Sequence, residues 1–139
     1  MTIQEIQEKI VDEFSMFEEV MDKYEHIIEL GSNLPGIEEQ FKIKDNLVKG
    51  CQSRVWLHAE QKDNKIIFFA DSDTLITKGI VALLIRVFSG HTPREIAEAN
   101  LFFIDQIGFK RLLSPTRNNG LLEMVNQMKL YAKTLQTNC

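Results

Sequence analysis

Cys51 is the residue whose type and surroundings are best suited to nucleophilic chemistry. A Gly precedes it and a Gln-Ser pair follows it, which is typical of a loop, and Lys49 and Arg54 place positive charge nearby. Positive charge favours the thiolate, which is the reactive form of cysteine. Free cysteines are also among the most buried residue types, so Cys51 is either a nucleophile or a small apolar core residue.

Other chemistries have less support. Zinc sites need Cys or His ligands in closely spaced pairs, and the two cysteines and three histidines form no such pair. Glycine-rich phosphate loops are absent from the sequence. A Cys-His hydrolase would need a base near Cys51, and His58 is the candidate, seven positions along the chain. Without an evident base, thiol chemistry is favoured, in which a thiolate attacks another sulfur.

The composition bounds the class of protein. With 139 residues, we expect a single domain over residues 1–139. The net charge of −4 argues against nucleic acid as a partner. No apolar run approaches about 18 residues, so we expect no membrane span, and residues 1–5 do not resemble a signal peptide. The two cysteines, Cys51 and Cys139, are expected to be free thiols in the cytoplasm.

The first thirty residues predict two helices, or one bent helix, over about residues 3–30. Thr2 and Glu5 have the spacing of a capping box, and residues 15–18 offer a second one. An apolar stripe at helical spacing then follows. It consists of Phe17, Val20, Met21, Tyr24, Ile27 and Ile28.

The middle of the chain predicts a small sheet of about three strands. Residues 41–44 are a candidate short strand, and residues 54–60 alternate apolar and polar side chains. Residues 66–70 are β-branched and aromatic, and the turn at 62–65 makes the last two strands a β-hairpin.

Helices are expected on both sides of the sheet in the sequence. Residues 71–74 supply cap residues for a buried helix that ends at Gly90. Thr92 and Pro93 begin another helix, a short one ends at Gly108, and an amphipathic stripe over 121–135 defines the last. The fold class is therefore α+β, a small antiparallel sheet packed against several helices. Arg117 falls in a predicted loop, either solvated or in contact with an anion or a partner.

The chain resembles the SufE family of sulfur-acceptor proteins. The motif Gly-Cys-Gln-Ser followed by Val-Trp is specific to that family, as are Asp-Ser-Asp and Ser-Pro-x-Arg-x-Asn-Gly. The matching stretches cover nearly the whole chain in the family's order. They are residues 24–35, 46–57, 71–84, 92–96 and 113–121.

The resemblance implies a mechanism. A cysteine desulfurase of the SufS type would use its own pyridoxal phosphate to form a persulfide, and Cys51 would accept that sulfur and pass it to a cluster scaffold complex. This chain would need no cofactor or metal of its own. It would stimulate the desulfurase and not be an independent enzyme. The implied fold is that of the iron–sulfur scaffolds (IscU/NifU N-terminal-like), whose three ligand cysteines this chain lacks.

Alternatives to this mechanism stay open at the level of sequence. The partner could be a paralogous, CsdA-type desulfurase, or the protein could be a binding activator without obligatory Cys51 chemistry. We expect Lys49, Gln52, Asp73 and Arg117 to support the site or contact the partner. We also expect Leu47, Val48 and Trp56 to shelter Cys51, in a protein that is a monomer or a weak homodimer.

Overall fold

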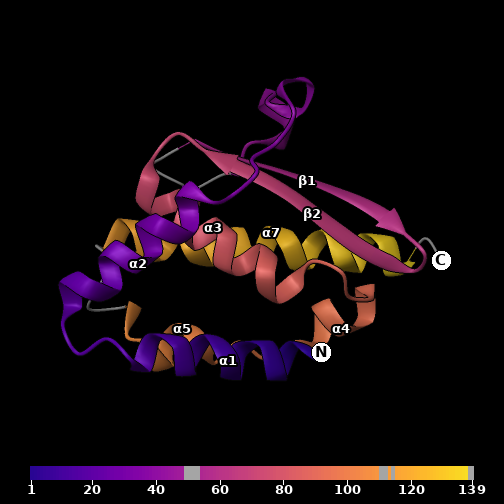
Figure 1. Ribbon diagram of the computed structural model, residues 1–139. Helices are drawn as coiled ribbons and strands as arrows, with labels where there is room; N and C mark the ends of the chain where they lie inside the picture. The colour runs from indigo at the N-terminus through magenta and orange to yellow at the C-terminus, as the bar shows by residue number, and fades with distance from the viewer. Residues whose placement is uncertain (49–53, 110–112, 114, 138–139) are drawn as a thin grey trace.

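The computed structural model describes the chain except for residues 49–53, 110–112, 114 and 138–139, together with the side chains of 116, 117 and 135–137. Its elements form three layers (Figure 1). A two-stranded sheet lies on one side of helices α3 (Leu75–Phe88) and α7 (Pro115–Thr137). Helices α1 (Ile3–Ser15) and α5 (Phe103–Gln106) lie on the other side.

The predicted N-terminal region forms two helices. α1 begins at the expected capping box, in which Thr2 and Glu5 exchange side-chain and backbone hydrogen bonds. The predicted second capping box is wrong, because α2 (Val20–Ser32) has Glu19 as its N-cap residue without a side-chain bond. Within the predicted apolar stripe, Val20 and Met21 are exposed, whereas Phe17 contacts the rings of Phe14 and His26. The later residues of the stripe pack in or against the core.

The β-hairpin forms as predicted, with slightly longer strands. β1 (Val55–Lys62) pairs antiparallel with β2 (Lys65–Ser72) in a register that runs from Val55 opposite Ser72 to Lys62 opposite Lys65. Asp63 and Asn64 close the hairpin with positive φ angles of 52° and 66°, as a two-residue turn requires. The helix-facing side of the sheet is buried and apolar. It includes Val55, Leu57, Ile66, Phe68 and Ala70.

The third strand expected at residues 41–44 is wrong. The described residues form a two-stranded sheet, and this region forms two 3₁₀ turns instead, η1 (Glu39–Phe41) and η2 (Lys44–Asn46). The segment lies over the sheet, on the side away from the helices (Figure 1). Phe41 stacks on His58 with ring centroids 3.9 Å apart. The segment therefore packs its side chains on the face of the sheet and does not pair with an edge strand.

Helices α2 and α3 cross at two glycines. A Cβ on Gly79 would lie 2.0 Å from the carbonyl oxygen of Ile27, and a Cβ on Gly31 would lie 2.6 Å from the nitrogen of Gly79. Side chains at either position would push the two backbones apart. Glycine at these two positions therefore permits the close approach of α2 to α3.

The remaining helices complete the core. α4 (Pro93–Glu98) begins at the predicted capping box of Thr92 and Glu95. Gln7, which is 1% exposed, ties α1 to the chain before α5 by three hydrogen bonds with Asn100, Phe102 and Phe103. In the described part of the chain, no helix has both the length and the apolar character needed to cross a membrane.

Candidate functional site

Three of the predicted site residues, Lys49, Cys51 and Gln52, lie outside the described residues. The described residues on either side of them, Val48 and Arg54, and the elements that hold these two residues define the candidate site. Asp73 and the backbone of Arg117 are described.

The chain before Cys51 is attached to β1. The backbone N–H of Val48 donates to the carbonyl of Val55 at 2.9 Å, and Leu47 forms an antiparallel bridge with Trp56. Val48 itself is 6% exposed. These contacts fix the chain three residues before Cys51 against the first residues of the strand that follows it.

The chain after Cys51 is attached to the end of β2. The N–H of Arg54 donates to Asp73 Oδ1 at 3.1 Å. The Arg54 carbonyl accepts from the Asp73 N–H at 3.3 Å and from Ser72 Oγ at 2.8 Å. Asp73 therefore lies beside the residue that follows the Cys51 segment and holds its backbone. Its predicted contact with a partner stays a prediction.

These contacts change the expected role of residues 71–74 as helix caps. Thr74 is the N-cap residue of α3, but its side chain makes no capping hydrogen bond. The Asp73 carboxylate turns toward Arg54, and Asp71 turns toward two lysines. The acidic motif therefore makes side-chain contacts with the backbone of Arg54, with Lys42 and with Lys78 in the first turn of α3.

Asp71 lies at the centre of a charged cluster beside this attachment. Its carboxylate is 3.3 Å from Lys42 Nζ and 3.4 Å from Lys78 Nζ, and it accepts the N–H of Ser72 at 2.8 Å. Burial on its own raises the pKa of Asp71. The Ser72 hydrogen bond and the two ammonium groups outweigh burial and hold that pKa below its ordinary value of 3.8.

Lys42 joins this cluster to an aromatic ring. Its Nζ lies 5.4 Å from the ring centroid of Trp56, within the range of a cation–π contact, and 3.2 Å from Glu39 Oε1. Hydrogen bonds to Glu39 and then Asp71 raise the pKa of Lys42. Trp56 opposes Asp71 across the hairpin, so these two side chains share a face of the sheet.

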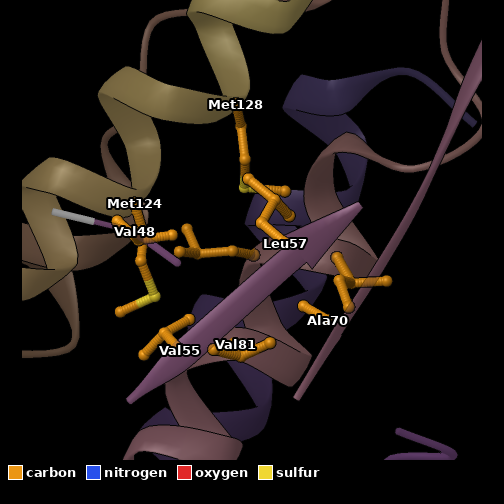
Figure 2. A pocket seen from close by; sticks show the side chains of 9 residues that line it. Val48, Val55, Leu57, Ala70, Val81, Met124 and Met128 are labelled. Carbon is orange, nitrogen blue, oxygen red and sulfur yellow. The ribbon is translucent and has the colours of Figure 1, made fainter. Parts of the chain in front are cut away.

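An apolar cavity of about 10 Å³ lies behind the attachment point of Val48 (Figure 2). It is close to the smallest space that holds a water molecule, and its lining residues carry no polar side chain. Met124 and Met128 reach it from α7, more than seventy residues further along the chain. Met128 belongs to the apolar stripe predicted for that helix, and Met124 does not. Its full lining is Val48, Val55, Leu57, Ala70, Val81, Leu84, Ile85, Met124 and Met128.

Arg117 lies in the first turn of α7 and not in the predicted loop. The helix begins at Pro115, a residue suited to the first helical position, and so starts before the apolar stripe. The Asn118 side chain, in the segment predicted to be a loop, donates to the carbonyls of Phe109 and Leu113. These bonds attach the first turn of α7 to the chain that precedes it.

His58, the candidate base of the hydrolase hypothesis, lies on the outer face of the sheet. Its ring lies between Phe41 and Phe69. Its Nε2 is 3.4 Å from Glu60 Oε1, an ion-pair distance without hydrogen-bond geometry. Val55 and Leu57 line the cavity from the opposite face, so His58 points away from it. Among the described residues, no group of three or more His, Cys, Asp or Glu side chains is placed to hold a metal ion.

Comparison with known proteins agrees with this architecture. The chain matches the solution structure of a hypothetical protein from Thermus thermophilus with a TM-score of 0.78, at 16% identity and over 95% of this chain and 96% of that one. At this identity the likeness shows the fold, which is the expected α+β class.

Relatives in sequence identify the family. SufE-like protein 1, chloroplastic/mitochondrial, of Arabidopsis thaliana is 37% identical over 138 residues, which is 96% of this chain but 37% of that protein. Uncharacterized SufE-like proteins of Rhizobium meliloti and Synechocystis are each 37% identical, over 91% and 92% of this chain and 94% and 80% of their own lengths. The predicted cytoplasmic location stays a prediction.

The family model described as "SufE: Fe-S metabolism associated domain" matches residues 8–132, a range that contains Cys51. The chain therefore belongs to the SufE family, whose domain is associated with iron–sulfur metabolism.

Proposed function

We propose that this protein accepts sulfur from a cysteine desulfurase on Cys51 and passes it on for iron–sulfur cluster assembly. The observation that carries the proposal is the family match over residues 8–132, which includes Cys51 in its Gly-Cys-Gln-Ser setting. The desulfurase supplies the pyridoxal phosphate that releases sulfur from free cysteine. This chain supplies the acceptor thiol, and the desulfurase turns over faster because its own cysteine is cleared.

The transfer step is a thiol exchange. The Cys51 thiolate attacks the outer sulfur of the desulfurase persulfide, and a bond forms between Cys51 Sγ and that sulfur. The S–S bond to the desulfurase cysteine breaks, and that cysteine leaves as a thiolate with the bonding electron pair. One disulfide-type bond replaces another, so the step needs no external oxidant or reductant, and a thiolate leaving group needs no general acid.

The described surroundings support a carrier more than a hydrolase. The segment that contains Cys51 begins and ends on one anchored unit, because Val48 is bonded to β1 and Arg54 to the end of β2. The apolar cavity behind Val48 lies on the helix-facing side of these anchors and is lined by no polar side chain. His58, the base a hydrolase would need, points away from that cavity.

The proposal is tested by incubating the protein with a purified desulfurase and cysteine, then measuring its intact mass. We expect the mass of one sulfur atom to be added at Cys51. Cys139→Ser is the matched control, because it leaves Cys51 as the one cysteine of the chain and should accept sulfur normally. Equal acceptance by Cys51→Ser would refute the proposal.

Two alternatives give different results in the same assay. A binding activator predicts that Cys51→Ala stimulates the desulfurase as fully as the wild type. Comparing SufS-type and CsdA-type desulfurases as donors identifies the partner, because the cognate enzyme should load Cys51 faster at equal concentration.

A further inference from the structure

A hollow of about 470 Å³ lies on the outer face of the sheet, beneath the segment that joins α2 to β1. Figure 1 shows this segment standing over the strands on the side away from the helices. The volume falls within the usual range for small-molecule sites, about 300–1,000 Å³. The hollow is separate from the cavity behind Val48, which lies on the opposite face of the same strands.

The hollow combines an aromatic surface with an acidic rim. Phe41 and Phe69 line it, and the side chain of Phe69 is 37% exposed although it is apolar. Glu38 and Glu60 are its charged lining residues, and the Glu60 side chain is 54% exposed. No lysine or arginine is among the described residues that line the hollow.

The neighbours of the two glutamates leave the negative charge of the rim in place. The side-chain amide of Gln40 donates to Glu38 Oε2 at 2.6 Å, and His58 Nε2 lies 3.4 Å from Glu60 Oε1. Lys42, the nearest lysine along the chain to Glu38, is engaged with Glu39 and Asp71. The hollow therefore offers two carboxylates and two aromatic rings to a group of opposite charge.

From this complementarity we infer that the hollow receives an arginine side chain of the protein partner. A guanidinium group is planar and stacks on aromatic faces, and its fork of N–H donors matches a carboxylate. A lysine ammonium is more strongly hydrated and does not stack in this way. The partner is the cysteine desulfurase, a step that rests on the proposed function.

The position of the hollow suits a single partner that also reaches Cys51. Trp56 pairs with Leu47 beside the segment that contains Cys51, and Glu60 lies four residues further along β1. Four strand residues span about 13 Å. A standard interface buries about 800 Å² on each partner, and an area of that size covers both points.

The first experiment tests the chemistry of the hollow without any partner. Nα-acetyl-arginine amide is titrated into the isotope-labelled protein, and amide chemical shifts are followed by NMR. We expect saturable shifts at Glu60 and Phe69, and much smaller ones with the citrulline analogue, which has the same shape but no charge. Equal shifts with both compounds, or shifts confined to other parts of the molecule, would overturn the inference.

Substitutions identify the groups responsible. Glu38→Gln combined with Glu60→Gln should weaken arginine binding about fivefold, since each exposed ion pair contributes modestly. Glu25→Gln, an exposed glutamate on α2, is the matched control and should leave binding unchanged. Thermal melting of the three proteins shows whether a loss of binding reflects a loss of folding. A double variant that folds and binds arginine as tightly as the wild type would contradict the assignment of the rim.

The second experiment identifies the occupant. A photoreactive p-benzoylphenylalanine replaces Phe69, and the protein is irradiated with the purified desulfurase. We expect a crosslink to an arginine-containing peptide of the desulfurase surface. A crosslink to a second copy of this chain, to a desulfurase segment without arginine, or to nothing would overturn the inference. Sulfur loading of Cys51 is measured in parallel, and it fails separately if the proposed function is wrong.

Discussion

Removal of the Asp73 carboxylate should loosen the backbone immediately after the Cys51 segment. Asp73→Ala deletes the acceptor of the Arg54 N–H, while the carbonyl of Arg54 keeps its bonds from Ser72 Oγ at 2.8 Å and from the residue 73 N–H at 3.3 Å. The effect should therefore be local and not a loss of fold.

The size of the effect follows from the geometry. An intramolecular hydrogen bond contributes a net 0.5–1.5 kcal/mol, roughly, and Asp73 is exposed, so about 1 kcal/mol is expected. Since about 1.4 kcal/mol is a tenfold change in an equilibrium constant, hydrogen exchange at the Arg54 amide should become about fivefold faster. The Val48 amide, which donates to Val55 at 2.9 Å, should change much less.

Amide exchange followed by NMR measures both positions in one sample. Asp73→Asn keeps an oxygen at the acceptor position and should restore most of the protection, which separates hydrogen bonding from charge. Asp12→Ala, an exposed aspartate on α1, controls for the loss of a carboxylate elsewhere. Unchanged exchange at Arg54 in Asp73→Ala would show that the carboxylate does not hold this backbone.

Three further substitutions test the scaffold. Gly79→Ala should lower the free energy of unfolding by at least about 2 kcal/mol in urea titrations, since its Cβ would lie 2.0 Å from the Ile27 carbonyl oxygen and the gain in helix propensity is only about 1 kcal/mol; a stabilised variant would contradict the close crossing. Gln7→Ala should cost about 2–4 kcal/mol by leaving backbone groups of residues 100–103 without partners, again by urea titration. Asp71→Asn tests linkage to pH: the folded-state pKa of Asp71 lies below its ordinary 3.8, so its stabilisation is present above that pH and lost as pH falls through the folded pKa. The stability difference from wild type should thus be larger at pH 7 than at pH 3, and a pH-independent difference would refute this.

Local signals were enough to predict many of the elements. The capping boxes at Thr2 and Thr92 each depend on two residues three apart, and both form as the sequence indicates. The strand predicted at residues 41–44 does not form, although a two-stranded sheet leaves edges with which it could pair. The side chains of Phe41 and Lys42 instead contact the face of the sheet, which a local pattern does not reveal.

The site was predictable only where a motif marks it. Cys51 stands out through its immediate neighbours, and Asp73 through the acidic motif that contains it. The contact of Asp73 with Arg54 joins residues 19 positions apart, and the contact of Met124 with the cavity joins α7 to β1. Such contacts depend on the packing of whole elements, which periodicity within one element does not specify.

The anchoring of the chain on both sides of Cys51 sets a limit on how far the sulfur can be delivered. Cys51 is three residues from Val48 and three from Arg54. Three fully extended residues span roughly 10 Å, which is the greatest distance the Cys51 Cα can lie from either anchor while the anchors hold. If a desulfurase is the donor, as proposed, its cysteine must come to the sheet on a projecting segment, or the rim of its site must be open enough to admit the end of the hairpin. Under the proposed function, the protein would exchange sulfur at close range, by successive docking with donor and acceptor, and would not swing a long arm between them.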